Sequence, residues 1–164
     1  MRIISSLILA GALGACGGTP PSSSTTPLSG DTTPEVKSPV VSWDILAREP
    51  VANEAQVKHI LIGWKELADK FRGGQDPRAA ARSQVDADDT VKELLGKLAA
   101  GGDFDALMRE FSEDTGSASS SKPMKVSPDA GLVIEFRQLS LRLNVAEVGV
   151  CQSEYGYHII KRYL

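Results

Sequence analysis

Apolar and polar positions alternate regularly over the segment Ala55–Ile62. His59 would share one face with Val57 and Leu61, while Ile60 would point to the opposite face. Successive side chains of a strand point to opposite faces of a sheet, so this two-residue period predicts a β-strand.

The end of the chain alternates in the same way. Residues Val148–Gln152 and Tyr157–Tyr163 have the pattern of two strands, joined by a turn at Ser153–Gly156. In the second strand His158 and Ile160 would share a face. Two such runs separated by a short glycine-containing turn predict a closing hairpin.

Between these strands apolar residues recur at helical spacing. One helix would begin in the acidic segment Asp86–Asp89, where negative charge suits the helix dipole, and would end at Gly101-Gly102. A second would be capped by Asp103, and a third would cover Leu132–Leu143. The apolar stripes of the first two helices are Val91, Leu94, Leu95 and Leu98, and Phe104, Leu107, Met108 and Phe111.

Three shorter segments complete the pattern. Apolar residues of Trp64–Phe71 also have helical spacing, and Gly73-Gly74 would end that turn or helix. Gly116–Ser121 is a serine-rich loop, and Met124–Val126 is a short extended piece. The order strand, helices, strand, helix, strand, strand predicts an α+β domain.

The first residues have the layout of an export signal. Arg2 precedes an apolar stretch, Ile3–Leu13, which is too short to span a membrane. The following Leu13-Gly14-Ala15-Cys16 resembles the lipobox of bacterial lipoproteins. That resemblance implies removal of residues 1–15, lipidation of Cys16 and anchoring in the bacterial cell envelope. Gly17 after the cysteine resembles the class sorted to the outer membrane, if the host has one. An ordinary signal peptide with a chance cysteine is the alternative.

Residues 16–42 are predicted to be a lipidated cysteine followed by a tether. Glycine, proline, serine and threonine make up 19 of the 26 residues from 17 to 42. Such a segment buries too little apolar surface to offset its ordering entropy, so we expect it to be disordered. Residues 43–54 would be a linker or the start of the domain, and residues 55–164 the domain itself.

Composition supports this division and excludes several classes of protein. All nine aromatic residues lie at or beyond Trp43, so the part that can fold is C-terminal. The net charge of −3 argues against a nucleic-acid-binding protein. Two cysteines cannot by themselves form a disulfide framework or a structural zinc site.

Three blocks of the C-terminal part together resemble a parvulin-type peptidyl-prolyl cis/trans isomerase. Val57–Ile62 resembles the first parvulin strand with its histidine. Gly102–Asp114 resembles the helix that leads to the family's Cys-or-Asp position, and Ser153–Lys161 resembles its closing strand. The blocks occur in the family's order across residues 55–164.

The resemblance implies a four-stranded antiparallel sheet flanked by three to four helices, and a set of site residues. It implies that catalysis depends on four polar side chains: His59, Asp114, Ser153 and His158. Leu132 and Phe136 would line the proline pocket, and Tyr155 would take the position before the closing glycine. The histidines would belong to a hydrogen-bond network that orients Asp114 and Ser153.

Prolyl isomerisation breaks no covalent bond, so the predicted activity needs neither a cofactor nor a metal. The barrier of about 18–20 kcal/mol comes from the double-bond character of the C–N bond. The expected partners are unfolded or proline-containing exported polypeptides, and we expect the chain to be a monomer.

The sequence departs from the parvulin pattern at two turns. The glycine-rich turn after the Asp114 block reads Ser121-Lys122-Pro123-Met124-Lys125, and Ser127 stands where an aromatic is expected. The glycine expected before Glu147 is Ala146. The second strand and the pocket wall are therefore open to alteration.

Other interpretations remain open from the residues alone. A parvulin-like domain can bind unfolded polypeptide as a chaperone with little or no turnover. Combinations of His59, His158, Asp114, Cys151 and Ser153 could be read as a metal site or a hydrolase triad, but no zinc spacing or nucleophile elbow accompanies them. The histidines, Leu132 and Phe136 could be core residues, and Asp114 a turn residue.

The segment Lys65–Arg82 is basic, with Lys70, Arg72 and Arg78 between its ends. It would be a solvated surface. The family resemblance offers one alternative, a basic loop that favours acidic residues before proline.

Overall fold

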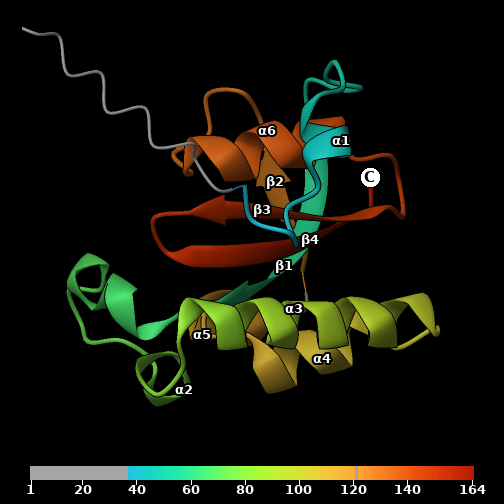
Figure 1. Ribbon diagram of the computed structural model, residues 1–164. Coiled ribbons are helices and arrows are strands. Elements are labelled where there is room, and N and C mark those ends of the chain that lie inside the picture. Colours follow the sequence, from blue (N-terminus) through green and yellow to red (C-terminus); the bar gives the residue numbers. More distant parts are fainter. Residues whose placement is uncertain (1–36, 121) are drawn as a thin grey trace, which may run out of the picture. The chain divides into compact units, whose positions relative to one another are not determined.

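The computed structural model describes residues 37–120 and 122–164. Four strands form one antiparallel sheet in the order β2-β1-β4-β3 (Figure 1). Their bounds are Ala55–Ile62 (β1), Met124–Val126 (β2), Val148–Ser153 (β3) and Gly156–Arg162 (β4). The predicted α+β fold with a four-stranded antiparallel sheet is confirmed, and the predicted strand bounds differ by at most one residue at each end.

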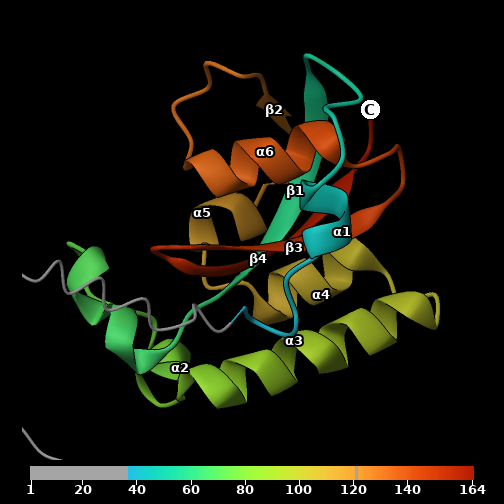
Figure 2. The same ribbon diagram turned by 45° about the horizontal axis from the view of Figure 1, so that its top comes forward.

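The two faces of the sheet bury two separate cores. One face packs against the long helix α3 (Gln84–Ala99) and against α4 (Phe104–Phe111), with Ile60 of β1 fully buried between them. The other packs against α6 (Ile134–Arg142) and α1 (Trp43–Leu46), with Val57 buried there. Figures 1 and 2 show these helix pairs on opposite sides of the sheet. The alternation predicted for β1 is therefore correct.

The helices begin at side chains that cap their first turn. Ser83 and Asp86 form a reciprocal capping box at the start of α3, and Asp103 accepts the amide of Ala106 at the start of α4. Such caps satisfy backbone amides that have no partner within the helix. The cap predicted at Asp103 is confirmed, and Asp86 takes part in the start of α3.

Three short helices complete the fold. The turn or helix predicted over Trp64–Phe71 is a 3₁₀ helix, η1 (Lys65–Lys70), and none of its residues is fully buried. The helix α2 covers Pro77–Ala80. Thr115–Ala118 forms α5 within the predicted serine-rich loop, because Asp114 accepts the amide of Ser117 and caps it.

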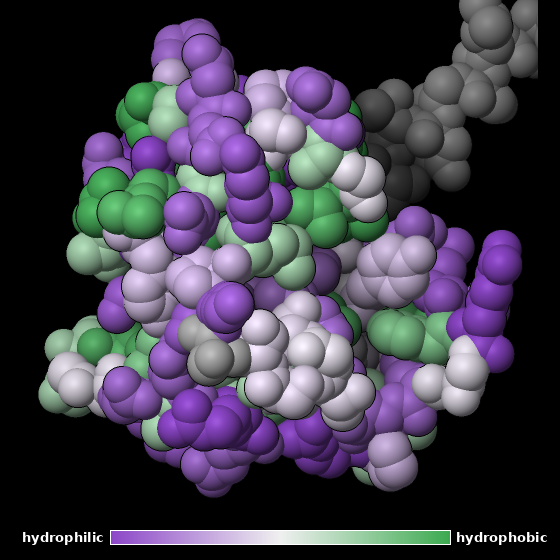
Figure 3. Space-filling model, turned by 180° about the vertical axis from the view of Figure 1, so that it is seen from behind, coloured by the Kyte–Doolittle hydropathy of each residue, from purple (hydrophilic) through white to green (hydrophobic). Residues whose placement is uncertain are grey.

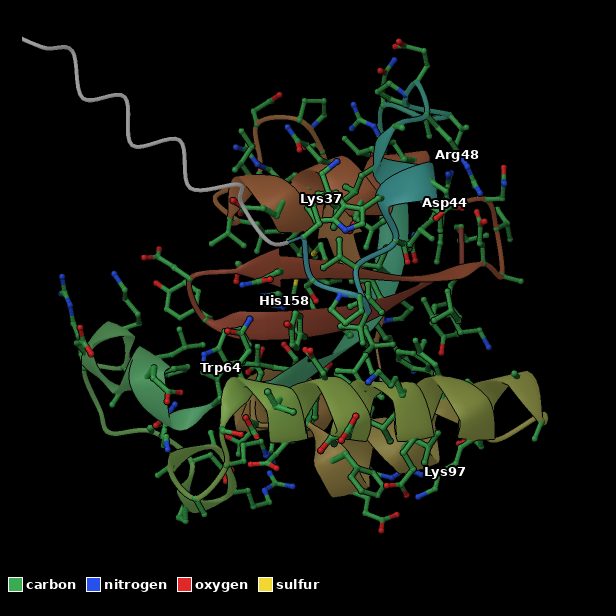
Figure 4. The ribbon with its side chains drawn as sticks, viewed as in Figure 1. Lys37, Asp44, Arg48, Trp64, Lys97 and His158 are labelled. Atoms are coloured by element: carbon green, nitrogen blue, oxygen red, sulfur yellow. The ribbon has the colours of Figure 1, made fainter. Side chains whose placement is uncertain are left out.

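The compact unit begins before residue 43. Residues 37–42 were assigned to the tether, yet Val40 and Val41 are each only 7% exposed and belong to the core beside α3. Ser42 donates its amide to Val150 of β3, and the ammonium of Lys37 lies 5.2 Å from the centre of the Trp43 ring (Figure 4). These six residues therefore belong to the domain. Residues 1–36, including Cys16, lie outside the described part.

The described part of the chain holds no helix long and apolar enough to cross a membrane.

The turn before β3 holds a non-glycine residue in a left-handed conformation. Ala146 has φ +68°, at the position where the parvulin pattern has glycine. Its amide donates to the carbonyl of Arg162, and the amide of Arg162 returns to Glu147, so the turn is fixed to the end of β4. A left-handed L-residue costs about 1–2 kcal/mol, which glycine avoids.

We expect Ala146→Gly to stabilise the domain. The relief of backbone strain exceeds the extra chain entropy of glycine, so the free energy of unfolding should rise by about 0.5–1 kcal/mol. Chemical denaturation measures this change. Ala99→Gly, at the exposed last residue of α3, is the matched control: it adds the chain entropy of glycine, relieves no left-handed strain and should not gain stability. Equal losses in both variants would contradict the prediction.

Candidate active site

A cavity of about 470 Å³ opens between β1, α6 and the turn that joins β3 to β4. Figure 3 views the molecule from behind, the side on which β2 and α5 lie in Figure 1. The cavity wall combines apolar side chains with two histidines and two carboxylates: His59, Leu61, Phe71, Glu113, Asp114, Thr115, Met124, Leu132, Val133, Phe136, Tyr155 and His158, with Gly131.

The sheet brings the two histidines together from positions almost a hundred residues apart. His59 lies on β1 and His158 on β4, and the register pairs His158 with Leu61, so both histidines lie on the same face. Their ring centroids are 5.4 Å apart with an angle of 21° between the planes. Each residue is 5% exposed, so only an edge of either ring reaches the cavity.

Four polar side chains form one continuous chain of hydrogen bonds. Ser153 Oγ lies 2.8 Å from His158 Nε2, and the Nδ1 atoms of the two histidines are 3.2 Å apart. His59 Nε2 lies 3.0 Å from Asp114 Oδ2. At the other end, the amide of Tyr155 donates to Ser153 Oγ at 3.1 Å.

With both rings neutral, one arrangement of protons satisfies every contact. An ionised Asp114 can only accept, so His59 carries its proton on Nε2 and accepts on Nδ1. His158 must then donate from Nδ1 and accept on Nε2, where the hydroxyl of Ser153 donates. The chain therefore fixes the tautomer of both rings.

The pKa values agree with this arrangement. The hydrogen bond from His59 holds the pKa of the Asp114 carboxyl far below its ordinary value of 3.8, and two hydrogen bonds from Ser117 add to the effect. Burial lowers the pKa of His158 from 6.5 to about 3. At neutral pH the network therefore consists of one carboxylate and an uncharged His158.

The apolar side of the cavity lies against the histidines. Phe136 of α6 is 2% exposed, and its ring stands nearly perpendicular to both imidazoles, at 5.0 Å from His59 and 5.4 Å from His158. Met124 of β2 and Leu132 complete this wall. The site thus places a hydrophobic pocket directly beside an ionised carboxylate.

Comparison with known proteins identifies the domain. The family model for the PPIC-type PPIase domain matches residues 44–162, which is most of the chain. The chain belongs to the parvulin family. It is 35% identical over 109 residues to the foldase protein PrsA of Geobacillus kaustophilus, a match that covers 66% of this chain and 39% of the relative.

Two further similarities extend the comparison. The chain is 29% identical over 112 residues to the chaperone SurA of Hahella chejuensis, covering 68% of this chain and 23% of that protein. The chain therefore spans less than half the length of these curated relatives. The peptidyl-prolyl isomerase ESS1 from Candida albicans shares the fold, with a TM-score of 0.53, 18% identity, and coverage of 68% of this chain and 63% of that one.

The structure brings the polar residues predicted from the parvulin resemblance into one site. His59, Asp114 and His158 reach the cavity wall, as do Tyr155 and the two predicted pocket residues. Ser153 is 8% exposed and lies behind the wall, where its contacts are His158 and the amide of Tyr155. Its place is therefore in the network and not on the surface of the cavity.

Sequence reasoning missed three residues of the candidate site. Met124 completes the apolar wall, Phe71 packs edge-on against Tyr155 at 5.7 Å, and Ser117 donates its hydroxyl to Asp114 at 2.6 Å. The alternation of Met124–Val126 was a usable signal, because it places Met124 and Val126 on the same face of β2. Nothing in the local pattern indicated Phe71 or Ser117.

The altered turn leaves the second parvulin strand in place. Without the family's glycines, residues Met124–Val126 still pair with Val57, Gln56 and Ala55 of β1. The closing glycine is retained: Gly156 has φ +130°, and a Cβ there would collide with the carbonyl oxygen of Ile62. The framework of the cavity is therefore intact.

The rival chemistries do not match the geometry. Asp114 bonds His59 and not His158, so Ser153, His158 and Asp114 do not form a hydrolase triad. Cys151 is fully buried, and burial strongly raises the pKa of its thiol. Within residues 37–120 and 122–164, no group of three or more His, Cys, Asp or Glu side chains could hold a metal.

The basic segment beside the cavity is largely neutralised by carboxylates. Arg82 pairs with Glu113 at 2.6 Å, Arg78 with Asp76 at 2.9 Å, and Lys70 with Glu154 at 3.7 Å. The carboxylate of Glu113 also accepts the amide of Gly63, and burial raises its pKa. The cavity wall contains carboxylates and no lysine or arginine.

Proposed function

We propose that this domain catalyses cis/trans isomerisation of Xaa-Pro bonds in polypeptides. The observation that carries the proposal is the cavity in which the apolar wall of Met124, Leu132 and Phe136 meets the carboxylate of Asp114. A proline ring fits the chemistry of the wall, and the peptide carbonyl before it would lie toward the polar side.

The physical task is to stabilise a twisted amide. Rotation about the prolyl bond removes the conjugation that puts partial negative charge on oxygen and double-bond character in C–N. An apolar pocket holds the ring while the carbonyl turns. A fixed negative charge near the carbonyl oxygen disfavours the planar, charge-separated form relative to the twisted one, so it lowers the barrier.

The buried histidines would act as positioning residues. His59 donates to Asp114 and His158 donates to His59, and both rings lie almost fully out of solvent, so their contacts are with the network and not with the substrate. The network holds the carboxylate in one orientation and keeps it ionised. Asp114 is therefore the polar group that we assign to direct contact with the substrate, with Ser153, His59 and His158 behind it.

The client is proposed to be an exported polypeptide, met at the cell envelope. Support comes from the lipobox-like Leu13–Cys16, from the tether that follows it, and from relatives that are a foldase and a chaperone. Anchoring would occur through lipid on Cys16, in the outer membrane if the host has one. The tether would hold a monomeric domain away from the bilayer surface.

Cys16→Ser is expected to abolish anchoring. Without the thiol no lipid can attach, so the full chain should leave the membrane fraction of a bacterial host and lose incorporation of labelled fatty acid. Cys151→Ser, which removes the buried thiol, is the control and should keep both properties. Fatty-acid labelling that persists in Cys16→Ser would refute the anchor.

Leu132→Ala tests the proposed prolyl isomerase activity of the full chain. Loss of one apolar wall contact should reduce kcat/KM on short Xaa-Pro peptides by about tenfold, corresponding to about 1.4 kcal/mol of transition-state binding. Exchange NMR of the cis and trans signals measures the rates. Leu164→Ala, at an exposed leucine that does not line the cavity, should leave the rates unchanged.

The wild-type rates decide between the proposed enzyme and the binding module. Catalysed exchange supports the enzyme. Uncatalysed rates, together with intact binding of an unfolded protein, would replace it with a chaperone that has no turnover.

A further inference from the structure

A second cavity of about 240 Å³ adjoins the first. It lies beside β1 and β2, next to α4 and α5, and His59 and Met124 line both cavities. The two cavities therefore adjoin at the side chains of His59 and Met124. Figure 3 looks onto this side of the molecule.

The floor of the second cavity is apolar. Val57 is fully buried, Met108 of α4 is 2% exposed, and Pro123 and Met124 close the side toward the first cavity. Its volume is below the roughly 300–1,000 Å³ of typical small-molecule pockets, so it suits single side chains better than a whole small ligand.

Charge does not dominate this cavity. Lys58 lines it, but its ammonium is held at 2.6 Å from Asp105 and lies 5.2 Å from the centre of the Tyr163 ring. That pairing leaves little net field for an anionic ligand. Ser120 and Lys122 lie at the exposed edge of the cavity. An apolar side chain entering past these two residues is the best chemical match.

The second cavity also touches the polar network. Ser117 lines it and donates its hydroxyl to Asp114, the carboxylate in the wall of the first cavity. An extended peptide advances about 3.3–3.6 Å per residue, so a chain with proline at Phe136 can place a side chain past Met124 within a few residues. Occupation of both cavities would hold the chain across the catalytic carboxylate.

We propose that the second cavity binds an apolar side chain of the client, a few residues away from the isomerised proline. This inference rests on the proposed function, because it treats the first cavity as the proline site. It makes an aliphatic residue near the proline a recognition element of the client. Short peptides would bind at the first cavity alone.

The experiment compares proline peptides that differ at one flanking position. In a nine-residue peptide with proline at the centre and serine at every flanking site, leucine is placed at each position from four before to four after the proline. At one or two positions leucine should raise kcat/KM about three- to tenfold over the all-serine peptide. An effect at no position would overturn the proposal.

A blocking variant locates the effect in the second cavity. Ser120→Trp fills its edge, whereas Ser119→Trp places the same bulk on the neighbouring exposed residue, which does not line either cavity. Ser120→Trp should remove the advantage of leucine while leaving the all-serine peptide unchanged. Ser119→Trp should keep the advantage. If both variants keep the advantage of leucine, or both lose it, the effect does not arise in the second cavity.

Binding measurements keep this inference separate from the proposed activity. If no peptide is isomerised, the proposed function fails, but amide shifts of Gly116 and Ser120 in NMR titrations still report occupation of the second cavity. Shifts that follow the leucine peptides and are absent in Ser120→Trp support the site. Identical shifts with the leucine and all-serine peptides refute it.

Discussion

Asp114→Asn is expected to lower kcat/KM for Xaa-Pro peptides by about 10²-fold, with little change in the fold. Asparagine has the same shape, and its single oxygen can still accept the amide of Ser117, but its amide nitrogen then replaces the oxygen that accepts from His59 Nε2. The substitution therefore removes the negative charge and the acceptor that faces His59. Removing one preorganised electrostatic contact typically costs about 10²–10³ in rate, which sets the expected size.

Asp103→Asn is a closely matched control for this substitution. Asp103 and Asp114 each cap a helix by accepting the amide of the third residue that follows, Ala106 or Ser117. Asparagine and aspartate are similar as caps, so the structural cost should be alike in the two variants. Asp103 does not line either cavity, and its variant should retain wild-type rates. Parallel losses in both variants would show that the charge of Asp114 has no special role.

The same pair of variants separates the role of Asp114 in catalysis from its role as a helix cap. If Asp114 served only as a helix cap, Asp114→Asn would be nearly silent, because asparagine can keep the hydrogen bond from the amide of Ser117. If charge matters, the loss should appear mainly in kcat, since the twisted amide feels the carboxylate more strongly than the planar one. Separate measurement of kcat and KM therefore shows whether the carboxylate acts mainly on the twisted amide of the transition state.

Strand positions could be predicted well from the sequence because they depend on a strong local signal. β1 is buried on both faces, and its two-residue alternation sorts Val57 and Ile60 into different cores. The alternation of the last two predicted strands likewise located β3 and β4 to within one residue at each end. The short helices were not predictable in this way, since α5 depends on one capping contact from Asp114 and buries only Ala118.

The candidate site was predictable only where a motif marked it. His59 and His158 lie on strands far apart in sequence, and their 3.2 Å contact depends on the register of β1 against β4. Resemblance to parvulins supplied that pairing in advance. Phe71 and Ser117 entered the site through tertiary packing, which no local pattern encodes. The packing of Val40 and Val41 was missed because two valines are too few to mark a buried segment in a polar stretch.

The histidine network contributes both to the fold and to the candidate site. Its members connect β1, β4 and the start of α5, so the contacts that orient the carboxylate also join elements of the domain. Loss of either histidine should therefore disturb stability as well as activity. The effect on stability can be measured separately through proton binding, because proton binding is a property of the buried imidazole ring itself.

The wild-type domain is expected to lose stability as the pH falls below 6.5, through His158. Burial lowers the pKa of this ring from 6.5 to about 3 in the folded state. Between these values the unfolded chain binds a proton that the folded domain does not, so the free energy of unfolding rises with pH. From pH 6.5 to about pH 4.5 this should remove roughly 2 kcal/mol.

His158→Asn isolates this contribution. The asparagine amide can still donate to His59 Nδ1 but binds no proton in this range, so the variant should be less stable at neutral pH yet depend less on pH. Asp114 does not obscure the comparison, because its lowered pKa places its own loss below the ordinary carboxyl value of 3.8. Urea unfolding of both proteins at several pH values gives the two slopes. Coincident slopes above about pH 4.5 would mean that His158 already accepts a proton in the folded domain, and the proton arrangement assigned to the network would then be wrong.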